Sequence, residues 1–167
     1  MPMDHDAWLS PYNPQLKHFR PVLPTREEAI AYTTQRDTAR FLENDPNNFM
    51  IKVTDDETEE VVGYAVWEVN DPQGKEGKKG DLMSLVVHPS HRHRGAGRLL
   101  IRWGIAKADE LGIETVISSL ASAKAAYEKC GLGAIEIIPP NPELKRRLGD
   151  LEKQGRGRSG RSCWRMI

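Results

Sequence analysis

The sequence lacks several features that mark large classes of protein. Its two cysteines, Cys130 and Cys163, lie far apart and fit neither a metal-binding cluster nor a disulfide framework. It has no run of roughly 20 apolar residues, the length that a membrane-spanning helix needs. Its 24 basic side chains balance 24 acidic ones, so no net charge draws it to nucleic acid or to an anionic membrane. We therefore expect reduced thiols in a protein of the cytoplasm or nucleus, with no nucleic-acid or membrane partner.

The start of the chain carries no recognisable motif. It is acidic and lacks the basic segment and apolar run of a secretory signal, so we expect none. Prolines recur there among polar residues, at Pro2, Pro11, Pro14, Pro21 and Pro24. We therefore predict an irregular arm over residues 1–24. Since 167 residues suffice for one domain but not for two ordinary ones, we predict a single domain over residues 1–167.

The next segment begins with a helix signal and continues into a hairpin. Thr25 and Glu28 have the spacing of a capping box, which predicts a helix to about Glu43 with a weak apolar face at Ile30 and Phe41. β-Branched and aromatic residues then cluster at 49–53 and 61–69, on either side of the acidic, turn-forming residues 55–60. Alternation in the second strand places Val62, Tyr64, Val66 and Glu68 on one face and Val61, Ala65, Trp67 and Val69 on the other.

The rest of the chain alternates strands and helices. After a Gly- and Lys-rich loop at 70–80, residues 82–87 form an apolar run that predicts a central strand, ended by Pro89. A helix should follow to Leu111, ended by Gly112, with an apolar side at Leu99, Leu100, Trp103, Ala106 and Leu111. The remaining predicted elements are a strand at 113–118, a helix at 122–130, a strand at 134–138, a helix at 141–153, a loop at 154–161 and a strand at 162–167. This order predicts an α/β (α+β) fold, a mixed sheet with helices on its faces.

The chemically informative segment is the turn between the strand at 82–87 and the following helix. Small residues, Gly95, Ala96 and Gly97, fall where the helix begins. Its first turn leaves several N–H groups without partners at the positive end of the helix dipole, and glycine lets phosphate oxygens approach them. Arg92, Arg94 and Arg98 add positive charge, so the turn predicts a diphosphate site.

Alternative interpretations of this turn fit less well. A Rossmann site needs a further glycine in register and an acidic residue about 20 positions later, and a Walker A loop needs a Gly-Lys-Ser/Thr ending; neither is present. His88, His91 and His93 could hold a metal, but the interleaved arginines oppose a dication, so we predict no metal site. An ordinary turn that caps a helix is the remaining structural alternative.

The residues of this turn resemble a known signature. Arg92-x-x-Gly95-x-Gly97, after an apolar strand that ends Val87-x-Pro89, is similar to the coenzyme A motif of the GNAT superfamily of N-acetyltransferases. The resemblance implies the GNAT fold, with a mixed, mostly antiparallel sheet, and acetyl-CoA as the cofactor. It implies that the strand before the loop is bulged and that its backbone bonds the pantetheine arm. The implied cofactor-binding residues are Leu85, Val86, Val87, Arg92, His93, Arg94, Gly95, Ala96, Gly97 and Arg98.

A second segment supports the same resemblance. Ala126-Tyr127-Glu128-Lys129-Cys130-Gly131-Leu132 is similar to a later motif of the superfamily, whose tyrosine lies beside the coenzyme A sulfur and can protonate the departing thiolate. The likeness extends over about residues 49–132 and loosely over 162–167. It departs from the pattern at Leu120, where Asn or Ser is common, at Leu132, where an aromatic is common, and in lacking a convincing strand before the first helix.

The implied reaction is direct attack of a neutral amine on the thioester. Tyr127 is the predicted general acid, with a buried core tyrosine as the alternative interpretation. Asp81 occupies the place of a catalytic glutamate in some relatives, and Glu68 is a second candidate base, although both could be ordinary surface carboxylates. The acceptor, a small-molecule or peptide amine, is expected to contact the first helix and the loop at 70–80. A monomer or a homodimer is compatible with the sequence.

Two other functions stay open at this point. One is a domain that binds acyl-CoA without turnover and serves regulation. The other is a module that binds RNA or another polyanion through arginines of the C-terminal loop and strand, Arg156, Arg158, Arg161 and Arg165.

Overall fold

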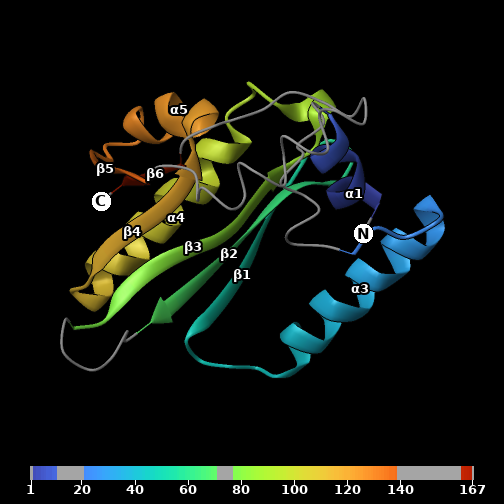
Figure 1. The fold of residues 1–167 in the computed structure, drawn as a ribbon, viewed down its shortest axis with the longest axis horizontal. Helices are drawn as coiled ribbons and strands as arrows, with labels where there is room; N and C mark the ends of the chain where they lie inside the picture. The colour runs from blue at the N-terminus through green and yellow to red at the C-terminus, as the bar shows by residue number, and fades with distance from the viewer. Residues whose placement is uncertain (1, 11–20, 71–76, 139–162, 167) are drawn as a thin grey trace. The chain divides into compact units, whose positions relative to one another are not determined.

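The computed structural model describes residues 2–10, 21–70, 77–138 and 163–166 of the chain. They form two compact units, Met1–Thr115 and Val116–Ile167. The first contains α1 (Pro2–Leu9), α3 (Arg26–Leu42), β1 (Asn48–Thr54), β2 (Val61–Asn70), β3 (Lys79–Val87), the short η2 (Pro89–His91) and α4 (Ala96–Leu111). The second contains most of β4 (Glu114–Leu120), then η3 (Ala121–Ala123), α5 (Lys124–Glu128), β5 (Ala134–Ile138) and β6 (Cys163–Met166) (Figure 1).

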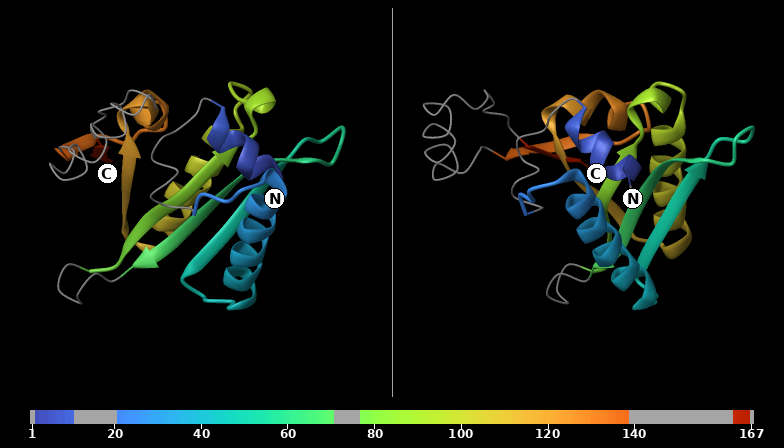
Figure 2. Two further views of the ribbon diagram at one scale, coloured as in Figure 1. Left: turned by 45° about the vertical axis from the view of Figure 1, so that its right-hand side comes forward. Right: turned by 90° about the vertical axis from the view of Figure 1, so that its right-hand side faces the viewer.

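The first unit is built on an antiparallel sheet in the order β1-β2-β3. The register places Ile51 opposite Ala65, and Ala65 opposite Leu85 on the other side. Helices α1 and α3 lie on one side of this sheet and α4 lies on the other (Figure 2). The predicted hairpin and third strand are therefore confirmed, and so is the capped helix, because Thr25 Oγ1 accepts a bond from the Glu28 N–H at 3.2 Å.

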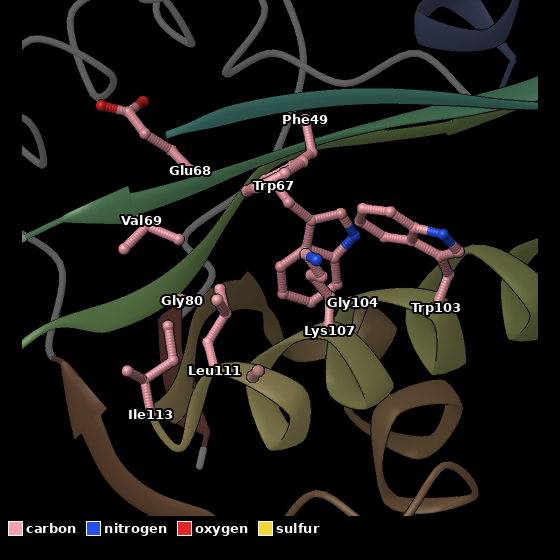
Figure 3. A pocket seen from close by; sticks show the side chains of 11 residues that line it. Phe49, Trp67, Glu68, Val69, Gly80, Trp103, Gly104, Lys107, Leu111 and Ile113 are labelled. Atoms are coloured by element: carbon pink, nitrogen blue, oxygen red, sulfur yellow. The ribbon is translucent and has the colours of Figure 1, made fainter. Parts of the chain in front are cut away.

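The two faces of β2 follow the predicted alternation. Tyr64 and Val66 are buried with Val86 of β3, against apolar side chains of α1. Ala65 and Trp67 point to the opposite face, where the Trp67 ring packs against Gly104 of α4 (Figure 3). A methyl group at Gly104 would overlap that ring, so the glycine that weakens the helix locally is needed for packing.

This contact also explains an error in the predicted apolar side of α4. Leu99, Trp103 and Leu111 are exposed, whereas the buried residues of the helix are Ala96, Leu100, Ile101, Gly104 and Ala108. The small residues face the sheet because the large ring of Trp67 occupies the space there. Phe41 was likewise predicted on the inner face of α3 but is 66% exposed, and Thr33 is the buried residue of that helix.

The prediction of an irregular arm over residues 1–24 is wrong for Pro2–Leu9, which form α1. Proline is favoured at the first position of a helix, where its missing N–H costs nothing, and Asp4 in the first turn complements the helix dipole. Among the described residues before α3 there is no strand, so the family's opening strand is absent from this part of the chain.

In the second unit the strands pair in the order β4-β6-β5, and both pairings are antiparallel. The predicted strands at 113–118, 134–138 and 162–167 are confirmed as β4, β5 and β6. The predicted helix at 141–153 and the loop at 154–161 lie outside the described residues. No helix in the described ranges has the length and apolar character to cross a membrane.

Candidate active site

The predicted diphosphate turn has an unusual backbone conformation. After β3 ends at Val87, η2 leads into a loop in which His93 has a φ of 63°. Gly95, the residue that caps the start of α4, has a φ of 95° and so lies in the left-handed region that favours glycine. No side chain caps this end of the helix. The turn therefore presents its backbone directly.

The N–H groups at the start of α4 are available to a ligand. The first bond of the helix runs from the Leu99 N–H to the Gly95 carbonyl, at 3.1 Å. Within the described part of the chain, no carbonyl or side chain accepts a bond from the N–H groups of residues 95–98. These groups converge at the positive end of a 16-residue helix, which is the environment that binds phosphate oxygens.

Gly97 lies close to the end of β3. A methyl group built at Gly97 would contact the Val87 and Leu85 side chains at 3.7 and 3.9 Å, so a larger side chain would crowd the strand. Gly63, on the neighbouring strand, allows a closer approach, because a methyl there would lie 3.0 Å from the Val86 carbonyl oxygen. The small residues thus keep β3 and the beginning of α4 close together.

The three arginines of the turn do not behave alike. Arg94 and Arg98 are exposed, and Arg94 donates to His91 Nδ1 at 3.0 Å and lies 3.6 Å from an Asp55 carboxylate oxygen. Arg92 instead directs its guanidinium to backbone carbonyls, at 3.3 Å to Val87 and 2.8 Å to Ala7, with a further bond to Ser10. Arg94 and Arg98 are therefore exposed at the turn, Arg94 beside the His91 and Asp55 side chains, whereas the guanidinium of Arg92 is engaged by backbone carbonyls.

The histidines of the turn serve local hydrogen bonds. His88 Nδ1 lies 2.6 Å from Ser90 Oγ, and the rings of His88 and His91 meet edge to face. No cluster of three potential metal ligands occurs among the residues that the structure describes.

Strand β3 contains the irregularity that the resemblance implied. Val66 lies opposite Ser84, but the next residue, Trp67, lies opposite Leu82, so Met83 has no partner of its own on β2. Such a bulge bends the strand and redirects the groups that follow it. Here those groups belong to Leu85, Val86 and Val87, the predicted pantetheine contacts.

The two candidate bases are neighbours on adjacent strands. Glu68 of β2 lies directly opposite Asp81 of β3. Glu68 forms a 2.9 Å ion pair with Arg40 of α3, and Asp81 accepts a 3.0 Å bond from the Asn70 side chain. Val87, the last residue of β3, lies opposite Gly63 of β2, and Glu68 is five residues further along β2. Glu68 and Asp81 are therefore about 17 Å along the sheet from the end of β3, where the diphosphate turn starts.

Tyr127 belongs to α5 in the second unit and is 8% exposed. Burial raises the pKa of its phenol to about 12, and the nearby Cys130 adds to the increase. The hydroxyl is therefore protonated at neutral pH, the state that a proton donor needs.

The sequence matches a family model. Residues 8–132 match the model of the acetyltransferase (GNAT) family, which spans most of the chain. The chain belongs to this family. Its fold is accordingly the GNAT fold of the α+β class, and the chain is an acetyltransferase. Members of the GNAT family use acetyl-CoA.

Solved structures agree on the fold. A GNAT-family acetyltransferase from Desulfovibrio desulfuricans superposes with a TM-score of 0.58 at 20% identity, over 85% of this chain and 80% of that one. Glucosamine-6-phosphate N-acetyltransferase from Arabidopsis thaliana gives 0.57 at 13% identity, over 84% and 92%. A streptothricin acetyltransferase from Bacillus anthracis, in complex with acetyl coenzyme A, gives 0.53 at 17% identity, over 74% and 62%. The chain has no match among the curated proteins compared.

Neither of two clefts in the first unit of this GNAT chain adjoins the turn. The apolar slot in Figure 3, beside Trp67 and Gly104, holds about 10 Å³, which leaves room for one water molecule at most. A groove of about 310 Å³ lies between the end of α3, β1 and Trp103 of α4. It borders the edge of the sheet rather than the end of β3, so we do not assign it to the cofactor.

Sequence reasoning missed one buried polar pair. The Tyr64 hydroxyl donates a 2.6 Å bond to the carboxylate of Asp4, which is fully buried on α1. Burial and the charge of Asp4 raise the pKa of Tyr64 well above its ordinary value. The available signal was Pro2 followed by acidic residues, which is typical of a helix start.

Proposed function

We propose that this GNAT acetyltransferase transfers an acetyl group from acetyl-CoA to a primary amine, and that the turn at residues 92–98 holds the diphosphate. The observation that carries the proposal is the set of backbone N–H groups at residues 95–98, which converge at a helix start whose capping residue is a left-handed glycine. In this proposal the exposed Arg94 and Arg98 add charge–charge attraction, and the backbone of residues 85–87 bonds the pantetheine arm.

Bound acetyl-CoA supplies an acetyl group that is activated as a thioester. The amine must be neutral to attack that carbonyl, because its lone pair forms the new C–N bond as the C–S bond breaks. Asp81 is our first candidate to accept the amine proton and Glu68 the second; their bonds to Asn70 and Arg40 hold the two carboxylates in place. Tyr127, protonated at neutral pH, is the candidate to donate a proton to the departing thiolate.

The acceptor is proposed only by class. The structural neighbours include enzymes named for glucosamine-6-phosphate, for streptothricin and for the alanine of ribosomal protein S18, so both small molecules and peptide amines belong in a screen. The arginines of the polyanion alternative, Arg156, Arg158 and Arg161, lie outside the described residues. We also propose the cytoplasm as the compartment, and a monomer or homodimer as the assembly.

The test is an acceptor screen that measures free thiol. The purified chain is incubated with acetyl-CoA and with small amines, amino acids, antibiotics or peptides, and thiol release is followed. Release that depends on one class of amine supports the proposal. Tight acetyl-CoA binding with no release for any amine would instead support the regulatory acyl-CoA-binding alternative.

A further inference from the structure

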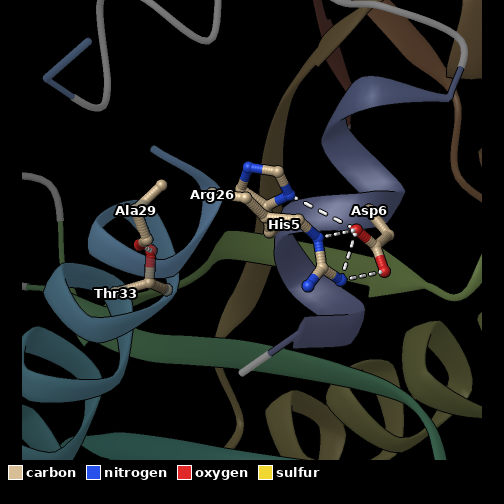
Figure 4. A network of polar contacts seen from close by, with 5 residues as sticks. All are labelled: His5, Asp6, Arg26, Ala29 and Thr33. Atoms are coloured by element: carbon tan, nitrogen blue, oxygen red, sulfur yellow. Dashed lines mark hydrogen bonds and ion pairs between the residues drawn. The ribbon is translucent and has the colours of Figure 1, made fainter. Parts of the chain in front are cut away.

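Helix α1 is fastened to the first unit by polar contacts at both of its ends. Near its start, Asp4 accepts the buried bond from Tyr64 of β2. In its middle, Asp6 accepts three bonds from the Arg26 guanidinium of α3, at 2.9, 3.0 and 3.3 Å (Figure 4). At its end, Arg92 donates to the Ala7 and Ser10 carbonyls. An eight-residue helix is too short to be stable alone, so these contacts and its packing must hold it.

The contact at the end of α1 involves the first residue of the coenzyme A motif. The Arg92 side chain bonds the Val87 carbonyl at the end of β3, the Ala7 carbonyl of α1 and the Ser10 carbonyl just after α1 at the same time. Arginine suits this position because its planar guanidinium offers several donors in a fixed fork, whereas lysine presents one flexible ammonium. The Arg92 side chain therefore links α1 and the end of β3 to the diphosphate turn, of which Arg92 is the first residue.

The apolar contacts of α1 reach both β2 and β3. Met3, Ala7 and Trp8 pack against the buried cluster that includes Val86, one of the predicted pantetheine contacts. The α1 helix thus packs against one face of β3, the predicted cofactor strand, while Arg92 connects the end of α1 to the diphosphate turn.

We propose that Arg92 is a positioning residue, through which docking of α1 sets the shape of the diphosphate turn and so the affinity for acetyl-CoA. This inference rests on the proposed function. With α1 docked, the guanidinium holds residues 92–95 in the conformation that exposes the N–H groups of residues 95–98. When α1 is released, the turn loses that support and binds the diphosphate more weakly. The competing interpretation is that the Arg92 side chain contacts a phosphate directly.

Affinity measurements on three variants separate these interpretations. Tyr64→Phe removes the bond to Asp4 and loosens α1 without touching the turn; Arg92→Lys breaks the carbonyl contacts but keeps the charge. We expect each to weaken acetyl-CoA binding about tenfold, within the usual range of coupling between sites. In the double variant the losses should overlap rather than multiply, because both act through α1. Tyr32→Phe, an exposed tyrosine of α3, is the matched control and should leave affinity unchanged.

The dependence of affinity on salt gives an independent readout. A side chain that contacts phosphate contributes a charge interaction that salt screens. Under our proposal Arg92→Gln lowers the affinity but leaves its salt dependence as in the wild type. A direct phosphate ligand would instead give Arg92→Gln a flatter salt dependence, and Tyr64→Phe would bind like the control; that result would overturn the inference.

Hydrogen exchange tests the link between Arg92 and α1 both in the apo protein and with acetyl-CoA bound. In the apo protein, Arg92→Lys should speed exchange of the backbone amides at the end of α1, and acetyl-CoA should slow it in the wild type, since coupling is reciprocal. If Tyr64→Phe fails to fold, Asp6→Asn, which weakens the exposed contact with Arg26, takes its place with a smaller effect in the same direction. A wild type that does not bind acetyl-CoA refutes the proposed function and this inference together. Binding with α1 exchange unchanged in every variant refutes the inference alone.

Discussion

Replacing Tyr127 by phenylalanine tests its burial and its proposed role in one variant. The change removes the hydroxyl and keeps the ring, so packing in α5 is largely preserved. As a general acid, Tyr127 should contribute to turnover but not to cofactor affinity. We expect kcat to fall about 100-fold, the lower end for acid catalysis, because a donor with a pKa near 12 is poorly matched to neutral pH.

The same variant tests the raised pKa through stability. An unfolded tyrosine ionises with a pKa of about 10, so between pH 10 and 12 the unfolded state loses its proton first and the native state is destabilised as the pH rises. For a native pKa of about 12, the loss between pH 9 and pH 11 is about 1 kcal/mol. Phenylalanine does not ionise, so the free energy of unfolding of Tyr127→Phe does not include this loss. The stability of the wild type relative to Tyr127→Phe should therefore be lower at pH 11 than at pH 9 by that amount.

The assay is urea unfolding of both proteins at pH 9 and pH 11, with kcat and the acetyl-CoA Kd measured at neutral pH. Tyr32→Phe serves as the exposed control. A stability difference between wild type and Tyr127→Phe that is equal at the two pH values would refute the burial of the hydroxyl. If kcat of Tyr127→Phe is within twofold of the wild type, Tyr127 is a packing residue and not the general acid.

Two further substitutions test other parts of the account. Gly104→Ala should destabilise the fold by about 1–3 kcal/mol in thermal or urea unfolding, although alanine is the better helix former, because the methyl group would overlap the Trp67 ring; a gain in stability would contradict this packing. Ala106→Gly, at an exposed position of the same helix, is the control and should cost about 1 kcal/mol. Asp81→Asn should remove the acidic limb of the pH–rate profile if Asp81 is the base, and an unchanged profile would eliminate it.

The elements with clear periodicity were predictable from sequence. The hairpin of β1 and β2 follows from alternation over residues 61–69, and Thr25 and Gly112 mark helix ends by their local chemistry. The turn at residues 92–98 was also predictable, because a left-handed glycine at a helix start is a local requirement.

Features that depend on distant partners were not predictable. The buried face of α4 is set by Trp67, which reaches Gly104 from another element, so a hydrophobicity pattern within the helix points to the wrong side. Helix α1 was missed because Pro2 was interpreted as a breaker rather than as a first helical residue. The bonds of Arg92 to α1 join residues more than 80 positions apart, and no local signal encodes them.

The most direct test of the proposed site compares two glycines at opposite ends of α4. Gly95 and Gly112 both have a positive φ, at 95° and 65°, and among the described residues a methyl group at either would meet no atom within 4 Å beyond the adjoining chain. Substitution by alanine therefore strains the backbone at both, by about 1–2 kcal/mol. Calorimetric titration with acetyl-CoA should show at least a tenfold loss of affinity for Gly95→Ala and wild-type affinity for Gly112→Ala. Equal affinities for the two variants would contradict a diphosphate site at the start of this helix.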